Sequence, residues 1–184
     1  SYKRDQVNAA AFAADCFFLT GDAGYINDQG ELFLTERIKD LFKTSNGKYI
    51  APQMIESLLL VDKFVDQVAV IADQRKFVSA LIVPAFNEIE AWATAHGIKF
   101  ESREQLCANE QVHNMMMERI ETLQQGLAPY EQIKRFTLCA HHFSINNGEL
   151  TNTLKIRRPV IYKDYKDVID KMYEKTPSDG LIAH

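Results

Sequence analysis

The chain has 184 residues, of which 46% are hydrophobic and 25% charged, and its net charge is −4. This ordinary globular balance allows one domain with a sizeable core or two small ones. The acidic balance argues against a nonspecific nucleic-acid binder, and no apolar run approaches the roughly 20 residues that a membrane span needs. The three cysteines stand far apart, which is typical of a reducing compartment without a disulfide framework.

The first 34 residues predict a short helix and a β-hairpin. The alanine-rich run Asp5–Ala14 favours a helix, and Cys16–Thr20 is a brief apolar strand. Tyr25–Ile26 and Glu31–Leu34 then flank Asn-Asp-Gln-Gly, a typical hairpin connection. Asp22 therefore lies at a strand end, next to two glycines. Taken alone, it reads as a turn aspartate that caps its own backbone.

The stretch TERIKDLFKTSNGKYIAPQMIE, Thr35 to Glu56, combines a charged segment, a turn and a helix start. Ser45–Lys48 is a turn signal, because glycine tolerates positive φ and asparagine nearly does. Ala51-Pro52 opens a helix, since the missing N–H of proline costs nothing in the first turn. Helical spacing predicts that four apolar residues form its buried side: Met54, Ile55, Leu58 and Leu59.

Three β-branched, apolar runs predict the main sheet. Val65–Ala72 and Phe77–Val83 are joined by four polar residues and read as an antiparallel pair. Ile133–Ala140 is a third strand. With helices between and after these runs, we expect an α+β fold: a small N-terminal hairpin segment, then a three-stranded antiparallel sheet packed with helices.

The helices are predicted from caps and periodicity. Asn87 is the expected N-cap of a helix over Glu88–His96, and Ser102–Gly126 reads as one or two helices with Ser102 as N-cap. Pro159 starts a last helix that runs to about Lys175.

The motif NNGELTNTLKIRR, Asn146 to Arg158, combines a turn, a short extended run over Leu150–Leu154 and then Lys155. By itself Lys155 reads as one solvated lysine in a basic run. The nearby pair His141-His142 does not predict a metal site, because adjacent side chains on a strand point apart.

Three motifs occur in the order FLTGDAGYINDQGEL, the Thr35–Glu56 stretch and NNGELTNTLKIRR. Together they resemble the AMP-forming acyl-CoA synthetases of the adenylate-forming superfamily, and in particular their long-chain fatty-acid branch. The resemblance extends to about Glu174. It implies that residues 1–39 are the end of a preceding N-terminal domain, 40–175 a mobile C-terminal domain and 176–184 a flexible tail.

The resemblance also implies roles for five residues. Asp22 would accept hydrogen bonds from the ribose hydroxyls of ATP, and Arg37 would contact the ribose or phosphate region. Asp40 would be the hinge, and Gly47 would let the backbone approach the thiol of CoA. Lys155 would bridge the acyl carboxylate and the α-phosphate, because a positioned ammonium offsets the repulsion between two anions.

The implied reaction converts fatty acid, ATP and CoA to acyl-CoA, AMP and pyrophosphate, with Mg²⁺ entering on ATP. The family's phosphate-binding loop and acyl pocket are not in this sequence, so we expect the N-terminal domain of the same polypeptide as partner and no activity from the chain alone. We expect a cytoplasmic protein and leave peripheral membrane association open. Two alternatives stay open: a noncatalytic interaction module of the same fold, and an adenylating domain that loads a carrier protein.

Overall fold

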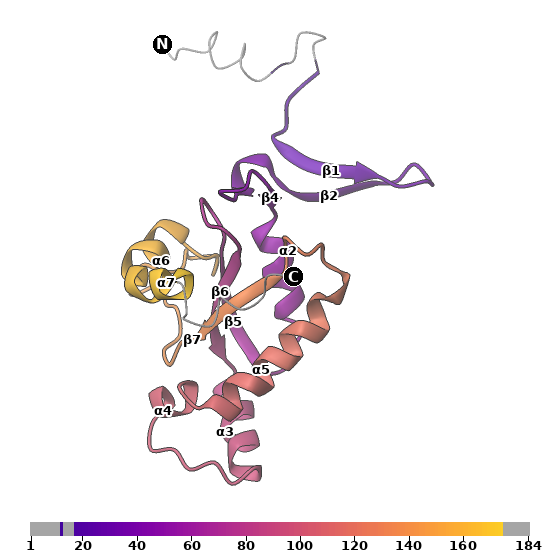
Figure 1. Ribbon diagram of the computed structural model, residues 1–184. Coiled ribbons are helices and arrows are strands. Elements are labelled where there is room, and N and C mark those ends of the chain that lie inside the picture. Colours follow the sequence, from indigo (N-terminus) through magenta and orange to yellow (C-terminus); the bar gives the residue numbers. More distant parts are fainter. Residues whose placement is uncertain (1–11, 13–16, 175–184) are drawn as a thin grey trace. The chain divides into compact units, whose positions relative to one another are not determined.

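The computed structural model describes residue 12 and residues 17–174, apart from the side chains of residues 35 and 36. The chain divides into two compact units, Ser1–Leu41 and Phe42–His184 (Figure 1). The helix expected over Asp5–Ala14 lies outside the described residues except for Phe12, and so do Cys16 and the expected tail over 176–184.

The first unit contains the expected hairpin. Its two antiparallel strands are β1 (Asp22–Ile26) and β2 (Leu32–Arg37). The short 3-10 helix η1 (Ile38–Asp40) follows them. Asn27 shapes the connection, because its side-chain oxygen accepts hydrogen bonds from the backbone N–H groups of Gln29 and Glu31, at 3.0 and 2.9 Å. The hairpin turn is therefore stabilised by hydrogen bonds between residues close in sequence, and such turns can be predicted from sequence.

Apolar side chains stand on both faces of this hairpin. Tyr25 stacks on Phe33 across the strands, with ring centroids 5.2 Å apart. Ile26 pairs with Leu32, and because successive residues of a strand point to opposite faces, this pair lies on the other side together with Leu34. These side chains are exposed, Ile26 at 69% and Leu34 at 67%. A two-stranded hairpin is marginally stable alone, and its exposed apolar side chains do not form a core of their own.

The second unit is built on a mixed three-stranded sheet, ordered β5-β6-β7. The strands are β5 (Val65–Ile71), β6 (Val78–Pro84) and β7 (Ile133–Leu138). β5 and β6 are antiparallel, as expected, but β7 runs parallel to β6. The α+β class is confirmed, whereas the expectation of an antiparallel sheet is wrong for this pair. A long helical crossover separates β6 from β7, and such a connection returns the chain to the same end of the sheet.

The remaining elements follow most of the sequence signals. Their bounds are β3 (Phe42–Lys43), β4 (Tyr49–Ile50), α2 (Pro52–Leu59), α3 (Phe86–Ala95), α4 (Arg103–Cys107), α5 (Glu110–Leu123), η2 (Gln124–Gly126), α6 (Arg158–Asp164) and α7 (Lys166–Tyr173). Ser102 caps α4 as expected, since its hydroxyl accepts a hydrogen bond from the backbone N–H of Gln105 at 3.3 Å.

Three local expectations are corrected. The helix predicted from Asn87 begins earlier, with Ala85 at its N-cap, and Met54 of α2 is 38% exposed instead of buried. The single helix expected after Pro159 is two helices, α6 and α7, which meet at Tyr165. No helix within the described parts of the chain is both long enough and apolar enough to cross a bilayer.

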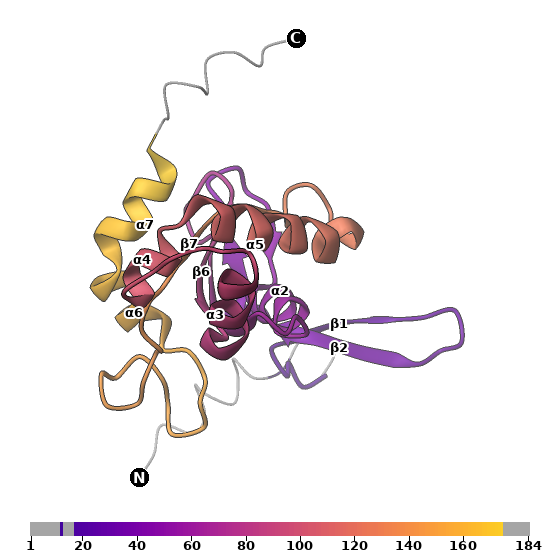
Figure 2. The same cartoon turned by 90° about the horizontal axis from the view of Figure 1, so that it is seen from below.

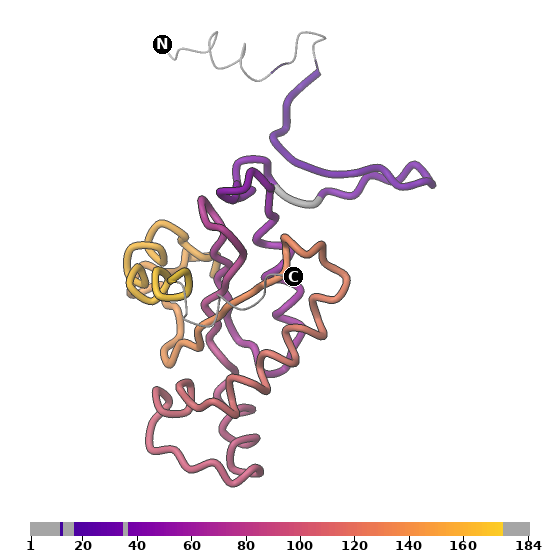
Figure 3. Tube along the Cα trace, viewed as in Figure 1, coloured from indigo at the N-terminus to yellow at the C-terminus, as the bar shows by residue number. Residues whose placement is uncertain are grey.

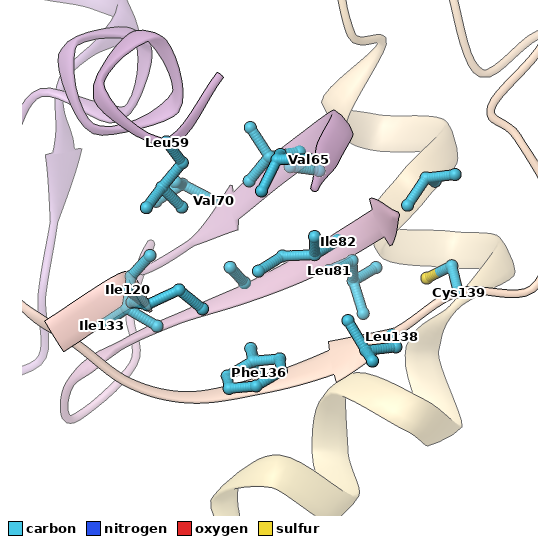
Figure 4. Close-up of a cluster of buried hydrophobic side chains, with 14 of the residues drawn as sticks. Leu59, Val65, Val70, Leu81, Ile82, Ile120, Ile133, Phe136, Leu138 and Cys139 are labelled. Atoms are coloured by element: carbon cyan, nitrogen blue, oxygen red, sulfur yellow. The ribbon is translucent and has the colours of Figure 1, made fainter. Parts of the chain in front are cut away.

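Helices cover both faces of the sheet. In the two views of Figures 1 and 2, α2 and α5 lie on one side of the strands and α6 and α7 on the other. All seven residues of β6 are buried, which is what a strand covered on both faces requires. Figure 4 shows Leu59 of α2, Ile120 of α5 and Ile133 of β7 among the side chains of this apolar core.

A buried ion pair joins three elements of the second unit. Glu56 of α2 is 8% exposed, and its two carboxylate oxygens lie 2.8 and 2.9 Å from the guanidinium nitrogens of Arg158 at the start of α6. One of these oxygens also accepts the backbone N–H of Val70 in β5, at 2.9 Å. The guanidinium also lies over the ring of Phe42, 5.0 Å from its centroid.

Removing one partner of this pair should be costly. Arg158→Ala leaves the Glu56 carboxylate buried without its counterion, so we expect a loss of about 3 kcal/mol in the free energy of unfolding. Urea unfolding of the chain measures it. Lys63→Ala is the matched control, because Lys63 forms an exposed ion pair with Glu88, 3.5 Å long, whose loss should cost no more than about 1 kcal/mol. Equal losses in the two variants would contradict the special role of the buried pair.

Candidate functional site

The hairpin of the first unit sets a carboxylate beside a guanidinium. Asp22 opens β1 and Arg37 closes β2, and the strand register pairs the two residues directly. The Nε atom of Arg37 lies 3.5 Å from the Oδ1 atom of Asp22, and their side chains are 74% and 30% exposed. The sequence placed these residues in separate motifs, and the hairpin joins them. A half-buried carboxylate of this kind can accept hydrogen bonds from two neighbouring hydroxyls, and the cation beside it suits an anionic ligand.

Asp40 lies next to the division between the two units. It is the last residue of η1 and is exposed. Leu41 follows with extended dihedral angles, φ −67° and ψ 134°, and the second unit begins at Phe42.

Gly47 stands in a closed loop between β3 and β4. The Gly47 N–H donates to the carbonyl of Thr44 at 2.9 Å, and the Lys48 N–H donates to the Thr44 hydroxyl at 3.1 Å. The φ angle of Gly47 is +77°, and a Cβ atom added there would meet nothing within 4 Å. This backbone conformation favours glycine, and the space beside its Cα is open.

The turn between β5 and β6 supports this loop. The backbone N–H of Ser45 donates to the carbonyl of Arg75 at 2.9 Å, and the side-chain amide of Asn46 donates to the carbonyl of Lys76 at 3.2 Å. Sequence reasoning missed this support, because no local signal relates two turns that lie about thirty residues apart.

Lys155 stands in a second closed loop, which Figure 3 shows in the orange stretch leading into α6. An isolated bridge between Leu150 and Ile156 closes the base of the loop. The Lys155 N–H donates to the Thr151 hydroxyl at 3.0 Å, and the Thr151 N–H donates to the Lys155 carbonyl at 2.8 Å. Leu154 has a φ angle of +59°, so the extended run expected over these residues is wrong and a tight turn takes its place. The Lys155 side chain is exposed.

A buried carboxylate anchors the base of this loop. Glu149 is 4% exposed, and its carboxylate accepts the backbone N–H of Ser144 at 2.8 Å and the hydroxyl of Tyr165 at 3.0 Å. The backbone carbonyl of Glu149 accepts a hydrogen bond from the backbone N–H of Arg157 at 2.7 Å, so the segments that enter and leave the loop are joined. Burial, and secondarily the hydrogen bond to the Glu149 carboxylate, raise the pKa of Tyr165 above its ordinary value.

The histidine pair faces two different carboxylates. The Nε2 atom of His141 lies 3.3 Å from Glu104, and that of His142 lies 3.2 Å from Asp66. Within residues 17–174, no group of three or more histidine, cysteine or acidic side chains could hold a metal ion.

The five predicted residues thus fall into separate places. Asp22 and Arg37 form a pair in the first unit, and Asp40 lies at its end. Gly47 and Lys155 occupy two different loops of the second unit. Sequence reasoning missed the threonines that close these loops, although each stands four residues before a lysine.

Comparisons with known proteins cover almost the whole chain. The family model for the C-terminal domain of AMP-binding enzymes matches residues 39–177. Human long-chain-fatty-acid–CoA ligase 1 is 36% identical over 94% of this chain and 25% of its own length. Arabidopsis thaliana long chain acyl-CoA synthetase 7, peroxisomal, is 33% identical over 98% of this chain and 26% of its own. The chain therefore spans about a quarter of the length of these curated relatives.

Solved structures share the fold. The A domain of a carboxylic acid reductase from Segniliparus rugosus, in complex with AMP and a co-purified carboxylic acid, matches with a TM-score of 0.72 and 25% identity, over 94% of this chain and 26% of that one. The adenylation domain of a carboxylate reductase from Mycobacterium chelonae matches with a TM-score of 0.70 and 23% identity, over 94% and 25% of the two chains. The second likeness concerns the fold alone.

The geometry of the Gly47 loop generates a stability prediction. Gly47→Ala forces a side chain into the left-handed region without any clash, so the free energy of unfolding should fall by about 1–2 kcal/mol. Gly126→Ala is the matched control, because Gly126 has equally open space and no positive φ, and its change should stay within about 0.5 kcal/mol. Thermal and urea unfolding of the chain measure both. If Gly47→Ala leaves the free energy of unfolding unchanged, the loop must relax to another conformation.

Proposed function

The chain belongs to the family of AMP-binding enzyme C-terminal domains, and from this membership we propose that it is the C-terminal domain of a long-chain fatty acyl-CoA synthetase. Fatty acid, MgATP and CoA are the substrates in this proposal. The observation that carries it is the presentation of Lys155, whose backbone is closed onto Thr151 while its side chain is exposed.

In the first half-reaction, a carboxylate oxygen of the fatty acid attacks the α-phosphorus of ATP, and the bond to pyrophosphate breaks. Two anions must approach, and the ammonium of Lys155 lowers their repulsion and offsets the charge that develops. Asp22 accepts hydrogen bonds from the ribose hydroxyls, and Arg37 lies beside it as the cation for the ribose or phosphate region. Mg²⁺ enters with the phosphates of ATP.

In the second half-reaction, the thiol sulfur of CoA bonds to the acyl carbon, AMP leaves and the thiol proton is released. The Gly47 loop serves this step, since the open space beside its Cα lets the pantetheine chain approach the backbone. Rotation about Asp40 exchanges the two loops between the steps, which is ordinary hinge behaviour.

The proposed division of the chain follows from the same reasoning. Residues 1–39 form the end of the preceding domain, 40–175 the mobile domain and 176–184 a tail. The apolar residues on both faces of the β1–β2 hairpin support this assignment, because packing against a larger domain would cover them. The N-terminal domain of the same polypeptide is therefore the proposed partner.

The chain alone should be inactive. The phosphate-binding loop and the acyl pocket of the family belong to the N-terminal domain, so we expect no fatty-acid-dependent ATP–pyrophosphate exchange from this chain. The parent enzyme is the positive control in the same assay. Robust exchange by the isolated chain would overturn the proposed division of labour.

Lys155→Ala in the parent enzyme should separate the two half-reactions. Loss of one preorganised charge costs roughly 10²–10³-fold in rate, so adenylation measured by pyrophosphate exchange should fall by this factor. Thioester formation from presynthesised acyl-adenylate and CoA should stay close to the wild-type rate.

Arg157→Ala is the matched control for Lys155→Ala. It removes a positive charge from an exposed position two residues away, and adenylation should stay within about twofold of wild type. Normal adenylation by Lys155→Ala would make Lys155 a solvated surface residue. Equal failure of both half-reactions would give it a structural role.

A further inference from the structure

The two loops that contain Gly47 and Lys155 are closed by the same two contacts, one between backbone groups and one from a backbone N–H to a side chain. In residues 44–48, the Thr44 N–H donates to the Lys48 carbonyl at 2.9 Å and the Lys48 N–H donates to the Thr44 hydroxyl at 3.1 Å. In residues 151–155, the Thr151 N–H donates to the Lys155 carbonyl at 2.8 Å and the Lys155 N–H donates to the Thr151 hydroxyl at 3.0 Å. Both loops therefore follow one pattern, a threonine closed onto a lysine four residues later.

The fourth position of each loop repeats as well. The N–H groups of Gly47 and Leu154 donate to the carbonyls of Thr44 and Thr151, both at 2.9 Å. Both residues are left-handed, with φ angles of +77° and +59°. Leucine rarely adopts this conformation, so the surrounding hydrogen bonds must hold it there. The shared conformation thus comes from the closure and not from glycine alone.

The threonine hydroxyl is the part of this closure that a side chain supplies. In each loop it accepts a hydrogen bond from the backbone N–H of the lysine, at 3.1 and 3.0 Å. The surroundings of the two hydroxyls differ: that of Thr44 also lies 3.2 Å from the Lys48 carbonyl, and that of Thr151 lies 3.0 Å from the Thr153 hydroxyl. A β-branched threonine also keeps its hydroxyl in a restricted rotamer, which favours one loop shape.

We infer that Thr44 and Thr151 are positioning residues, each serving one half-reaction. Thr151 holds the backbone of Lys155 for adenylation, and Thr44 holds the backbone around Gly47 for thioester formation. This inference rests on the proposed function of the two loops, but the hydrogen bonds that carry it belong to the second unit alone.

Valine and serine variants in the parent enzyme test the inference. Thr151→Val removes the acceptor at nearly constant volume, so adenylation should fall about fivefold to tenfold while thioester formation is unchanged. Thr44→Val should give the opposite pattern. Thr151→Ser and Thr44→Ser keep the hydroxyl, and each should recover at least half of the wild-type rate in the affected step.

Site-specific trypsin cleavage of the 184-residue chain supplies a readout independent of activity. Trypsin cuts after lysine and needs a locally opened backbone. Thr44→Val should speed cleavage after Lys48 several-fold and leave cleavage after Lys155 unchanged, and Thr151→Val should do the reverse. Mass spectrometry of the products separates the two sites. Urea unfolding verifies that each variant remains folded, and rates are compared only under conditions where it is.

The inference is supported if Thr151→Val affects only adenylation and cleavage after Lys155, and Thr44→Val affects only thioester formation and cleavage after Lys48. Equal slowing of both half-reactions by either valine variant, or serine variants that behave like valine, would overturn it. If Lys155→Ala leaves adenylation intact, the proposed function fails instead, and the trypsin rates still decide whether the hydroxyls close the loops. If cleavage after both lysines is unchanged in the valine variants, the closure itself is wrong.

Discussion

The ion pair between Glu56 and Arg158 is the constraint on which the second unit depends. Glu56 belongs to the helix that follows the Gly47 loop, and Arg158 begins the helix that follows Lys155. Their side chains meet below the surface, beside the backbone of Val70 in the sheet. A buried carboxylate without its counterion is strongly unfavourable, so the two helices hold one relative position. The loops that contain Gly47 and Lys155 each lead into one of these two helices, so the ion pair also restricts their relative position.

The loops that contain Gly47 and Lys155 are both short and closed by hydrogen bonds. Hydrogen bonds at the base of each loop restrict its conformation. In the Lys155 loop this base is Glu149, held by Ser144 and Tyr165. In the Gly47 loop it is the neighbouring turn that contains Arg75. Because each loop has its own support, a change in one tip need not disturb the other.

The hairpin of the first unit has a different physical character. Its apolar residues are exposed on both faces, whereas the apolar residues of the second unit form a buried core around β6. The strand register joins Asp22 to Arg37 at one end of the hairpin, so an ion pair and the apolar surfaces lie on a single element. A two-stranded hairpin of this kind is only marginally stable by itself.

The sequence by itself determined the features that depend on neighbouring residues. These include the Asn27 turn, the N-cap at Ser102, the three strands of the sheet and the motifs that place Asp22 and Lys155 in a family. Only the tertiary structure decided the parallel pairing of β7 and the ion pair between Glu56 and Arg158, which are 102 positions apart. The reason is physical: turns and caps are satisfied by local hydrogen bonds, whereas strand direction and buried charge pairs depend on how distant elements pack.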